Sequence, residues 1–207
     1  MYVPKAFEIT DRDEVITFLQ EHPFATLVTI NDGKPFATHL PLELEKNGDQ
    51  LFLTGHLAAA NPQWRHFSHN ESVLAMFQGP HAYISASWYT SSGQVPTWNY
   101  MAVHVYGKAR VVEESRLRAM LKEMLAKYEG GRENGVLWEQ VPAADMEKLL
   151  KAIVGFELEV ERIEAKYKLS QNKNKEDVQA VIRHLAASHE PVDQQVAAAM
   201  RCLHQGV

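Results

Sequence analysis

The chain has 207 residues, of which 45% are hydrophobic and 23% are charged. This composition is typical of a soluble globular domain and excludes collagen-like, disordered and disulfide-scaffold proteins. Acidic residues outnumber Lys and Arg by 26 to 21, and the formal net charge of −5 leaves no positive excess to neutralise a phosphate backbone. The charge balance therefore disfavours direct DNA binding.

The sequence predicts a cytoplasmic protein. Its single cysteine, Cys202, cannot form an internal disulfide. The first residues lack the basic and apolar regions of a signal peptide. No apolar run reaches the roughly 18 residues that a membrane span needs, so no membrane association is expected.

The N-terminal region predicts a helix followed by a β-meander. Residues 9–23 place Thr10 or Asp11 at an N-cap, ahead of apolar residues at helical spacing. The next segments are rich in Val, Leu, Phe and Thr, and they predict strands at 24–30, 35–44 and 50–55.

Two tight turns separate these strands. Asp32-Gly33 and Asn47-Gly48 supply residues that adopt the positive φ angles of short hairpins. A short helix is expected at 60–70.

The rest of the chain mixes strands and helices. Another strand is expected near 72–78, and extended segments at 81–89 and 95–112. Helical spacing of apolar residues predicts helices within 113–131 and 143–152 and two more in the tail, on either side of Pro191. Between them, residues 154–164 alternate apolar and acidic side chains and predict a strand with one solvated face. Strands in hairpin order with inserted helices favour an antiparallel barrel of the α+β class.

The middle of the chain is unusually poor in charge. Between Glu71 and Lys108 lie 36 consecutive residues without Asp, Glu, Lys or Arg, among them several Trp, Tyr and His. Aromatic enrichment with charge depletion is typical of a subunit interface or of a pocket for a flat ligand. Simple burial of central strands explains the aliphatic residues but not the many polar aromatic ones.

Several kinds of chemistry lack their motifs. The histidines have no metal-ligand spacing, and no G-x-S-x-G nucleophile motif occurs. The glycine-rich motifs of dinucleotide and P-loop sites are also missing. We therefore predict neither a metal site nor catalytic side chains.

Five motifs in order carry a resemblance to a known family. They are ATHLPL (37–42), TGHLAAANPQW (54–64), YISASWY (83–89), VPTWNY (95–100) and KLSQNK (168–173). With them the chain resembles, nearly end to end, the PaiB-type negative transcriptional regulators of the FMN-binding split-barrel superfamily. The resemblance implies a mostly antiparallel six-stranded split β-barrel with peripheral helices, which forms a homodimer and holds flavin mononucleotide (FMN) between subunits. It also implies a split-barrel domain at 1–173 and a C-terminal helical extension at 174–207.

The resemblance assigns cofactor-binding residues to three parts of the chain. Beside the flavin ring it places Thr38, His39, Leu40 and Pro41. Near the phosphate it places Thr54, Gly55, His56 and Asn61. Trp98, Asn99 and Lys168 close the site in this assignment.

The residues themselves leave other roles open. His39 is equally suited to a hydrogen bond at an interface. Asn61 followed by Pro62 is equally suited to starting a helix. Trp98 fits a dimer core. The family pattern has an arginine where this chain has Ala59 and a proline where it has Ala86, and the absent guanidinium weakens the expected grip on the phosphate.

Three functions therefore stay open at this point. The first is an FMN-binding negative regulator of transcription that acts indirectly, because no helix-turn-helix or basic patch is present. The second is an FMN-dependent oxidoreductase, whose chemistry would belong to the cofactor. The third is a vestigial barrel that has lost flavin binding, motivated by Ala59.

Overall fold

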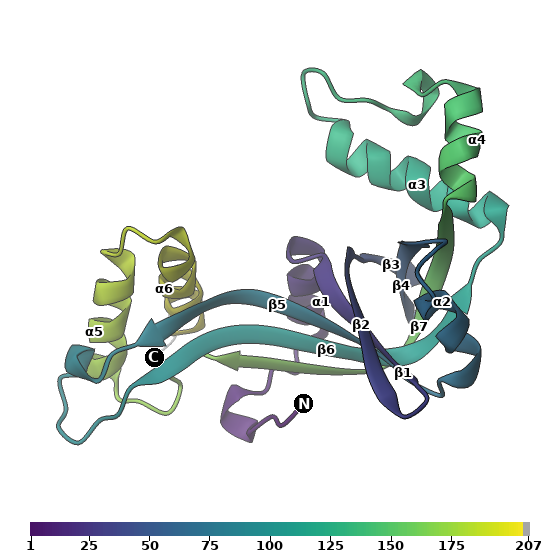
Figure 1. Ribbon diagram of the computed structural model, residues 1–207. Coiled ribbons are helices and arrows are strands. Elements are labelled where there is room, and N and C mark those ends of the chain that lie inside the picture. The colour runs from purple at the N-terminus through teal and green to yellow at the C-terminus, as the bar shows by residue number, and fades with distance from the viewer. Residues whose placement is uncertain (205–207) are drawn as a thin grey trace. The chain divides into compact units, whose positions relative to one another are not determined.

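The computed structural model describes residues 1–204, which form one seven-stranded sheet and six α-helices (Figure 1). The strands are β1 (Phe24–Asn31), β2 (Lys34–Pro41), β3 (Glu43–Asn47), β4 (Gln50–Ala58), β5 (Val73–Ile84), β6 (Thr97–Val111) and β7 (Ile153–Lys168). The helices are α1 (Arg12–Glu21), α2 (Gln63–His66), α3 (Glu114–Glu129), α4 (Ala143–Lys151), α5 (Lys175–Ala186) and α6 (Pro191–His204). No helix of this described part is long and apolar enough to cross a membrane.

The strands follow the order β2-β1-β5-β6-β7-β4-β3, so the sheet is not closed into a ring. The pairs β1–β2, β3–β4 and β4–β7 are antiparallel. The predicted α+β class with an antiparallel sheet and peripheral helices is confirmed. The sheet has seven strands, where the family resemblance implied six: the predicted strand at 35–44 is two strands, β2 and β3, and the predicted segments at 72–78 and 81–84 are one strand, β5.

The chain divides into two compact units. Unit 1 comprises residues 1–22, 77–104 and 164–207, of which 205–207 lie outside the described residues. Unit 2 comprises residues 23–76 and 105–163. Strands β5, β6 and β7 contribute residues to both units. The domain boundary expected after residue 173 stays a prediction.

In unit 2 the sequence of the first hairpin determines its geometry. Asp32 and Gly33 have φ values of 50° and 72°, as the predicted tight turn requires.

The expectation of one continuous strand over 35–44 is wrong, because the chain changes partner at Leu42. The amide of Leu42 donates to the carbonyl of Pro23, and the next residues pair with β4 instead of β1. The side chain of Leu42 is buried at this break, which anchors it in the core.

Close packing in unit 2 depends on one glycine of β6. A Cβ atom at Gly107 would overlap the backbone carbonyl of Glu159 on β7 and also approach Leu158. The neighbouring core positions Leu27, Leu53, Val73, Phe156 and Leu158 have no exposed surface. Each large apolar side chain buried in this way contributes about 1.5–3 kcal/mol to folding.

In unit 1, α1 begins where the sequence predicts. Asp11 is its N-cap, and its carboxylate accepts hydrogen bonds from the amides of Asp13 and Glu14 at 2.9 and 3.0 Å. The ring of Phe18 packs 5.5 Å from that of Tyr167. A Cβ atom at Gly79 would lie 2.7 Å from the Phe18 ring, so the glycine is what lets α1 approach β5.

Two predicted segments of the middle region have different boundaries. Residues 72–78 and 81–89 were expected to be separate, but β5 continues without a break through Gly79-Pro80 to Ile84. The chain then turns into a short 3-10 helix at Ala86–Trp88, where the Ser85 hydroxyl accepts from the amide of Ser87.

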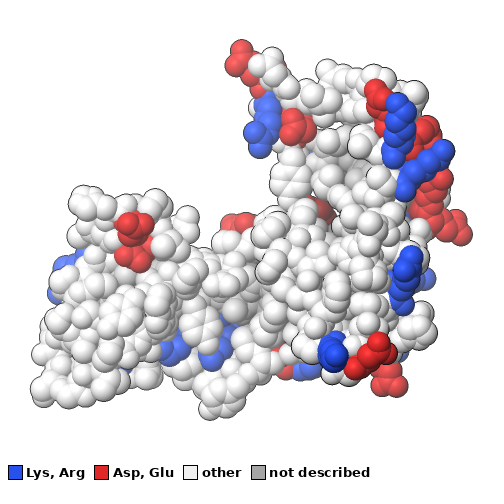
Figure 2. All heavy atoms as spheres, in the orientation of Figure 1, with Lys and Arg blue, Asp and Glu red and all other residues white. Residues whose placement is uncertain are grey.

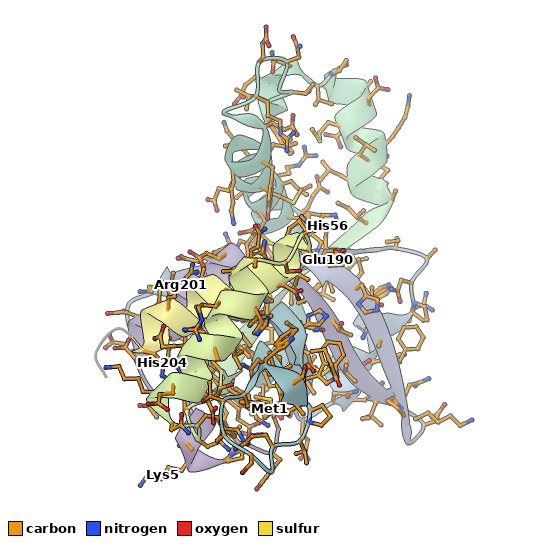
Figure 3. The ribbon with its side chains drawn as sticks, turned by 90° about the vertical axis from the view of Figure 1, so that its left-hand side faces the viewer. Met1, Lys5, His56, Glu190, Arg201 and His204 are labelled. Atoms are coloured by element: carbon orange, nitrogen blue, oxygen red, sulfur yellow. The ribbon has the colours of Figure 1, made fainter. Side chains whose placement is uncertain are left out.

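The C-terminal helices α5 and α6 belong to unit 1. Asn174 caps α5 by accepting from the amide of Asp177 at 2.8 Å. Val181, Leu185, Val196 and Met200 are fully buried between or below the two helices. At the end of α6, labelled in Figure 3, the His204 ring lies 3.0 Å from the carbonyl of Leu169, which ties this helix to the turn after β7.

Candidate functional site

Four predicted flavin-binding residues lie at the end of β2 in unit 2. Thr38 is half-buried, and its hydroxyl accepts a hydrogen bond from the Asn61 amide at 2.9 Å. His39 is exposed on the opposite face, where its Nδ1 lies 2.9 Å from the Thr26 hydroxyl and its ring stacks on Phe24. Leu40 is buried. The end of β2 therefore offers one polar pair, Thr38 with Asn61.

The predicted residues of β4 face different surroundings. The hydroxyl of Thr54 is buried and donates to Glu45 at 2.9 Å, so its proton is already engaged. A Cβ atom at Gly55 would lie 3.3 Å from the carbonyl of Pro41, so these two predicted residues are close together. His56 is half-buried, and burial lowers the pKa of its imidazole below the ordinary value. Burial therefore favours the neutral form of this histidine.

In the turn after β4, both polar atoms of the Asn61 side chain form hydrogen bonds. Its Oδ1 accepts from the amide of Gln63 at 3.0 Å, as an N-terminal cap of α2 would, while its Nδ2 donates to Thr38. The same turn carries Ala59, whose carbonyl accepts from the Trp64 indole at 3.2 Å. The guanidinium of Arg65 lies 4.9 Å from the centre of that indole ring.

Arg65 is exposed and forms no ion pair with another described residue. The family pattern has an arginine at the position of Ala59. In this chain the guanidinium of Arg65 packs over the indole ring of Trp64, which donates a hydrogen bond to the carbonyl of Ala59. The turn thus keeps a positive charge from a different position in the sequence.

A buried glutamine fixes this turn on the first hairpin. Gln63 has no exposed surface, and its Nε2 donates to the carbonyls of Leu27 and Phe36 at 3.0 and 3.2 Å. His66, also buried, lies 3.0 Å from the Thr29 hydroxyl. Neither residue was predicted to matter. The only signal was the NPQW segment itself, because the partners lie 27 to 37 residues away.

In unit 1, the predicted residues Trp98 and Lys168 come together, while Asn99 turns inward. The Lys168 ammonium donates to the carbonyl of Trp98 at 2.7 Å and to the hydroxyl of Thr97. Asn99 is 1% exposed and donates to the hydroxyl of Ser170 at 2.9 Å. Its Oδ1 has no hydrogen-bond partner among the described residues.

Lys168 belongs to a group of three lysines, which we call the lysine cluster: Lys166, Lys168 and Lys173. Every partner of their ammonium groups is neutral. Lys166 donates to the carbonyl of Tyr2, and Lys173 to the side chain of Gln94. Burial, and then the charges of Lys166 and Lys173, lower the pKa of Lys168 below the ordinary lysine value. Within the described residues none of the three forms an ion pair.

Next to the cluster, a buried carboxylate holds the loop after β5. Asp177 of α5 has no exposed surface and accepts from the amide and hydroxyl of Thr90 at 2.7 and 2.8 Å. The amide of Ser91 donates to it at 3.0 Å, and the Ser91 hydroxyl donates as well. These hydrogen bonds, those from Ser91 first, hold the pKa of Asp177 far below its ordinary value. No local sequence signal predicts these contacts, because Thr90 and Ser91 lie 87 and 86 residues before Asp177.

The predicted residues thus form separate small groups. Thr38 meets Asn61, and Pro41 lies against Gly55, all within unit 2. Trp98 meets Lys168 within unit 1. Among described residues, no hydrogen bond joins His39 or Thr54 to another predicted site residue. The part of the chain that the structure covers holds no group of three or more His, Cys, Asp or Glu suited to a metal ion.

The fold defines the class first: an α+β protein whose sheet is shared with solved flavoproteins. The flavocytochrome Anf3 from Azotobacter vinelandii matches with a TM-score of 0.62 at 18% identity, over 86% of this chain and 78% of that one. The FAD and heme binding protein from Mycobacterium smegmatis matches with a TM-score of 0.57 at 17% identity, over 84% and 79%. These likenesses support the predicted split-barrel fold.

Sequence comparison then gives the family. The chain belongs to the family described as "Putative FMN-binding domain", whose model matches residues 1–162. It is 52% identical to a Bacillus subtilis (strain 168) protein named Protease synthase and sporulation protein PAI 2, over 97% of this chain and 96% of that protein. The family resemblance inferred from the five motifs is confirmed.

Proposed function

We propose that this protein binds FMN and, through it, regulates gene expression indirectly. The observation that carries the proposal is the lysine cluster of unit 1, whose charges have only neutral partners. Burial, and then the charges of Lys166 and Lys173, disfavour the protonated form of Lys168, and a bound dianionic phosphate would offset that penalty. The donor set is therefore chemically suited to the phosphate of FMN.

Unit 2, taken by itself, offers an alternative set of contacts for FMN that does not involve the lysine cluster. The guanidinium of Arg65 at the turn is unpaired among described residues, and guanidinium groups make strong charge-assisted contacts with phosphate. Asn61 and Thr38 present polar atoms of fixed orientation, because each holds the other. FMN, when bound, would supply reversible electron transfer, and the protein residues named here would bind and orient it.

The regulatory part of the proposal rests on the Bacillus relative, which is named for protease synthesis and sporulation. A formal charge of −5 makes the isolated chain a poor ligand for duplex DNA, so we place a partner between this protein and the gene. A gel-shift assay should show only weak, sequence-independent binding at physiological salt. A tight, sequence-specific shift with protein alone would contradict the indirect mode.

We further propose that the protein is a homodimer in the cytoplasm. Exposed aromatic side chains on β5 and β6 support the dimer: Trp98 is 52% exposed and Tyr83 is 48% exposed. Their rings lie 5.9 Å apart, and His81 adds a third ring 6.1 Å from Trp98. Sedimentation should give about twice the chain mass of 23.5 kDa, and a monomer at micromolar concentration would contradict the proposal.

A flavin titration tests the central claim. FMN fluorescence quenching by the full chain should be saturable, and Lys168→Met should weaken binding by about tenfold or more, since one charge-assisted contact is lost. Lys5→Met is the matched control, because Lys5 is exposed, belongs to the same unit and is not a member of the cluster. Lys168→Arg should restore most of the affinity. Absence of saturable quenching in the unmodified protein would favour the vestigial barrel.

A further inference from the structure

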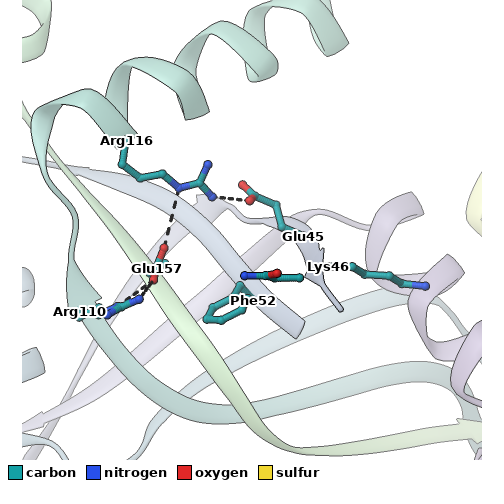
Figure 4. A pocket seen from close by; sticks show the side chains of 7 residues that line it. Glu45, Lys46, Phe52, Arg110, Arg116 and Glu157 are labelled. Atoms are coloured by element: carbon teal, nitrogen blue, oxygen red, sulfur yellow. Dashed lines mark hydrogen bonds and ion pairs between the residues drawn. The ribbon is translucent and has the colours of Figure 1, made fainter. Parts of the chain in front are cut away.

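A cavity in unit 2 is not accounted for by the proposed flavin contacts. It has a volume of about 390 Å³, within the usual size range of small-molecule pockets. We call it the arginine pocket, and its lining residues are Glu45, Lys46, Asn47, Phe52, Arg110, Arg116 and Glu157 (Figure 4). We propose that the arginine pocket binds a small planar organic anion, such as an aromatic phosphate or carboxylate, independently of FMN.

The two carboxylates of the pocket are already occupied by the wall itself. One oxygen of Glu45 accepts from Thr54 at 2.9 Å, and the other accepts from Arg116. Glu157 accepts two hydrogen bonds from Arg110, one of them from Nε at 2.8 Å, and lies 3.9 Å from Nε of Arg116. The acidic side chains therefore stabilise the arginines, and of their four oxygens Oε2 of Glu157 alone accepts no hydrogen bond from a described residue.

The guanidinium groups, in contrast, have donors to spare. An arginine carries five N–H donors. Arg110 uses Nε and Nη2, and Arg116 forms its one hydrogen bond through Nη2, so Nη1 of each is without a partner among the described residues. Asn47 adds a side-chain amide, which makes no hydrogen bond to any described residue. The lining thus has an excess of donors, which a ligand rich in acceptors would satisfy.

The charge and shape of the wall narrow the ligand class. Lys46, Arg110 and Arg116 give three positive charges against two negative ones, so the lining carries one net positive charge. Lys46 extends away from the two arginines in Figure 4 and has no ion-pair partner among described residues. The ring of Phe52 is half-buried and provides the one apolar surface of the lining. A flat ligand with an anionic group fits this combination.

Calorimetric titration of the full chain with phenyl phosphate tests the proposal, with inorganic phosphate and phenol as comparison ligands. Phenyl phosphate should bind at least tenfold more tightly than either, because only it has both the ring and the anion. Arg110→Gln should weaken it about tenfold or more. Arg110→Gln removes a partner of Glu157 and should lower stability, but the Arg110 side chain is 72% exposed, so the chain should still fold, and a thermal melt of the variant checks this. Arg132→Gln, an exposed arginine of the same unit outside the pocket, is the matched control and should have no effect.

Two further measurements separate this site from the flavin. Phe52→Leu should weaken phenyl phosphate but not inorganic phosphate. In the unmodified protein, phenyl phosphate should shift the arginine side-chain Nε–H signals in nuclear magnetic resonance spectra and should still bind after saturation with FMN. Displacement by FMN would make this the flavin pocket and overturn the independent site. No saturable binding, or equal losses in Arg110→Gln and Arg132→Gln, would also overturn it, whatever the result of the flavin titration.

Discussion

The lysine cluster and Asp177 of unit 1 differ from the arginines of the arginine pocket in unit 2 in the kind of partner that satisfies their charges. In unit 1, Asp177 and the lysine cluster are held by neutral hydroxyl, amide and carbonyl groups. In unit 2, Arg110 and Arg116 are held by the carboxylates of Glu45 and Glu157. Figure 2 shows Lys and Arg interspersed with Asp and Glu over the α3–α4 part of unit 2. A neutral partner satisfies the hydrogen bonds of a charged group but leaves its electric field in place. A partner of opposite charge satisfies the hydrogen bonds and also neutralises the field.

The comparison predicts the largest stability loss at Asp177. Asp177→Ala would leave the donors of Thr90 and Ser91 without an acceptor, and the melting temperature at pH 7 should fall by roughly 5–10 °C. Because the pKa of Asp177 is lowered in the folded state, its contribution is present above the ordinary carboxylate pKa and is lost as the pH falls below about 4.

Thermal melts of wild type and Asp177→Asn at pH 7 and pH 3 check this sign. The difference between the two proteins should shrink at the lower pH. A difference that stays constant would mean that the charge of Asp177 makes no contribution.

A positive charge added to unit 2 without a carboxylate partner should attract an anionic ligand, as proposed for the lysine cluster of unit 1. If the turn at 59–61 contacts the FMN phosphate, Ala59→Arg should tighten FMN binding by about ten- to a hundredfold, as expected for a charge-assisted contact of 1.5–3 kcal/mol. Arg65→Gln should act in the opposite direction. Fluorescence titration measures both, and matching thermal melts exclude unfolding. Unchanged affinity in both variants would remove the phosphate from this turn.

Breaking the ion pair between Arg110 and Glu157 in unit 2 should also lower the stability of the fold, by less than the loss of Asp177. The side chain of Glu157 is 12% exposed, and Glu157→Gln would leave Arg110 without its counter-charge. We expect the free energy of unfolding to fall by about 1–3 kcal/mol in urea titrations. The double variant Arg110→Gln with Glu157→Gln should lose less than the sum of the two single changes, and simple additivity would show that the pair does not interact.

The lowered pKa of Lys168 predicts a smaller, pH-dependent effect. FMN affinity should fall as the pH rises through the pKa of Lys168, which lies below the ordinary lysine value. Lys168→Arg should remove most of that decline, because arginine stays charged throughout this range. Titrations at several pH values up to 10 provide the measurement. An alkaline decline of the same size in Lys168→Arg would assign it to another group.

The exposed ion pair of Lys108 with Glu161 should show the smallest effect on the free energy of unfolding. The atoms are 3.3 Å apart, but the side chains are 68% and 45% exposed. Lys108→Ala should therefore change the free energy of unfolding by less than about 1 kcal/mol, and 1 M salt should leave that difference unchanged or smaller. A loss as large as that of Glu157→Gln would break the distinction between buried and exposed pairs.

The elements that the sequence predicted correctly are those with local causes. The cap at Asp11, the turn glycines at 33 and 48, and the helical spacing in the tail all act within a few residues. The break at Leu42 could not be predicted, because it arises where the chain exchanges β1 for β4 as its partner.

The candidate site shows the same division. The family resemblance named Lys168 and Trp98 for the same part of the site although they lie 70 residues apart, but it did not indicate the hydrogen bond between Asn61 and Thr38. Gln63 lies within a family motif that does not reveal its partners, and Asp177 and the arginine pocket carry no local motif. Only their surroundings in the fold make them distinctive.

Gly107 has a consequence for how this sequence can change over time. Because any side chain there would collide with the backbone of Glu159, substitution requires the β6–β7 pair to separate first. A single mutation at this codon is therefore penalised in every relative that keeps the pair, however freely the surface charges drift. We expect glycine at position 107 even in relatives whose ligand-binding residues differ from those of this chain. The position should therefore help to align such sequences.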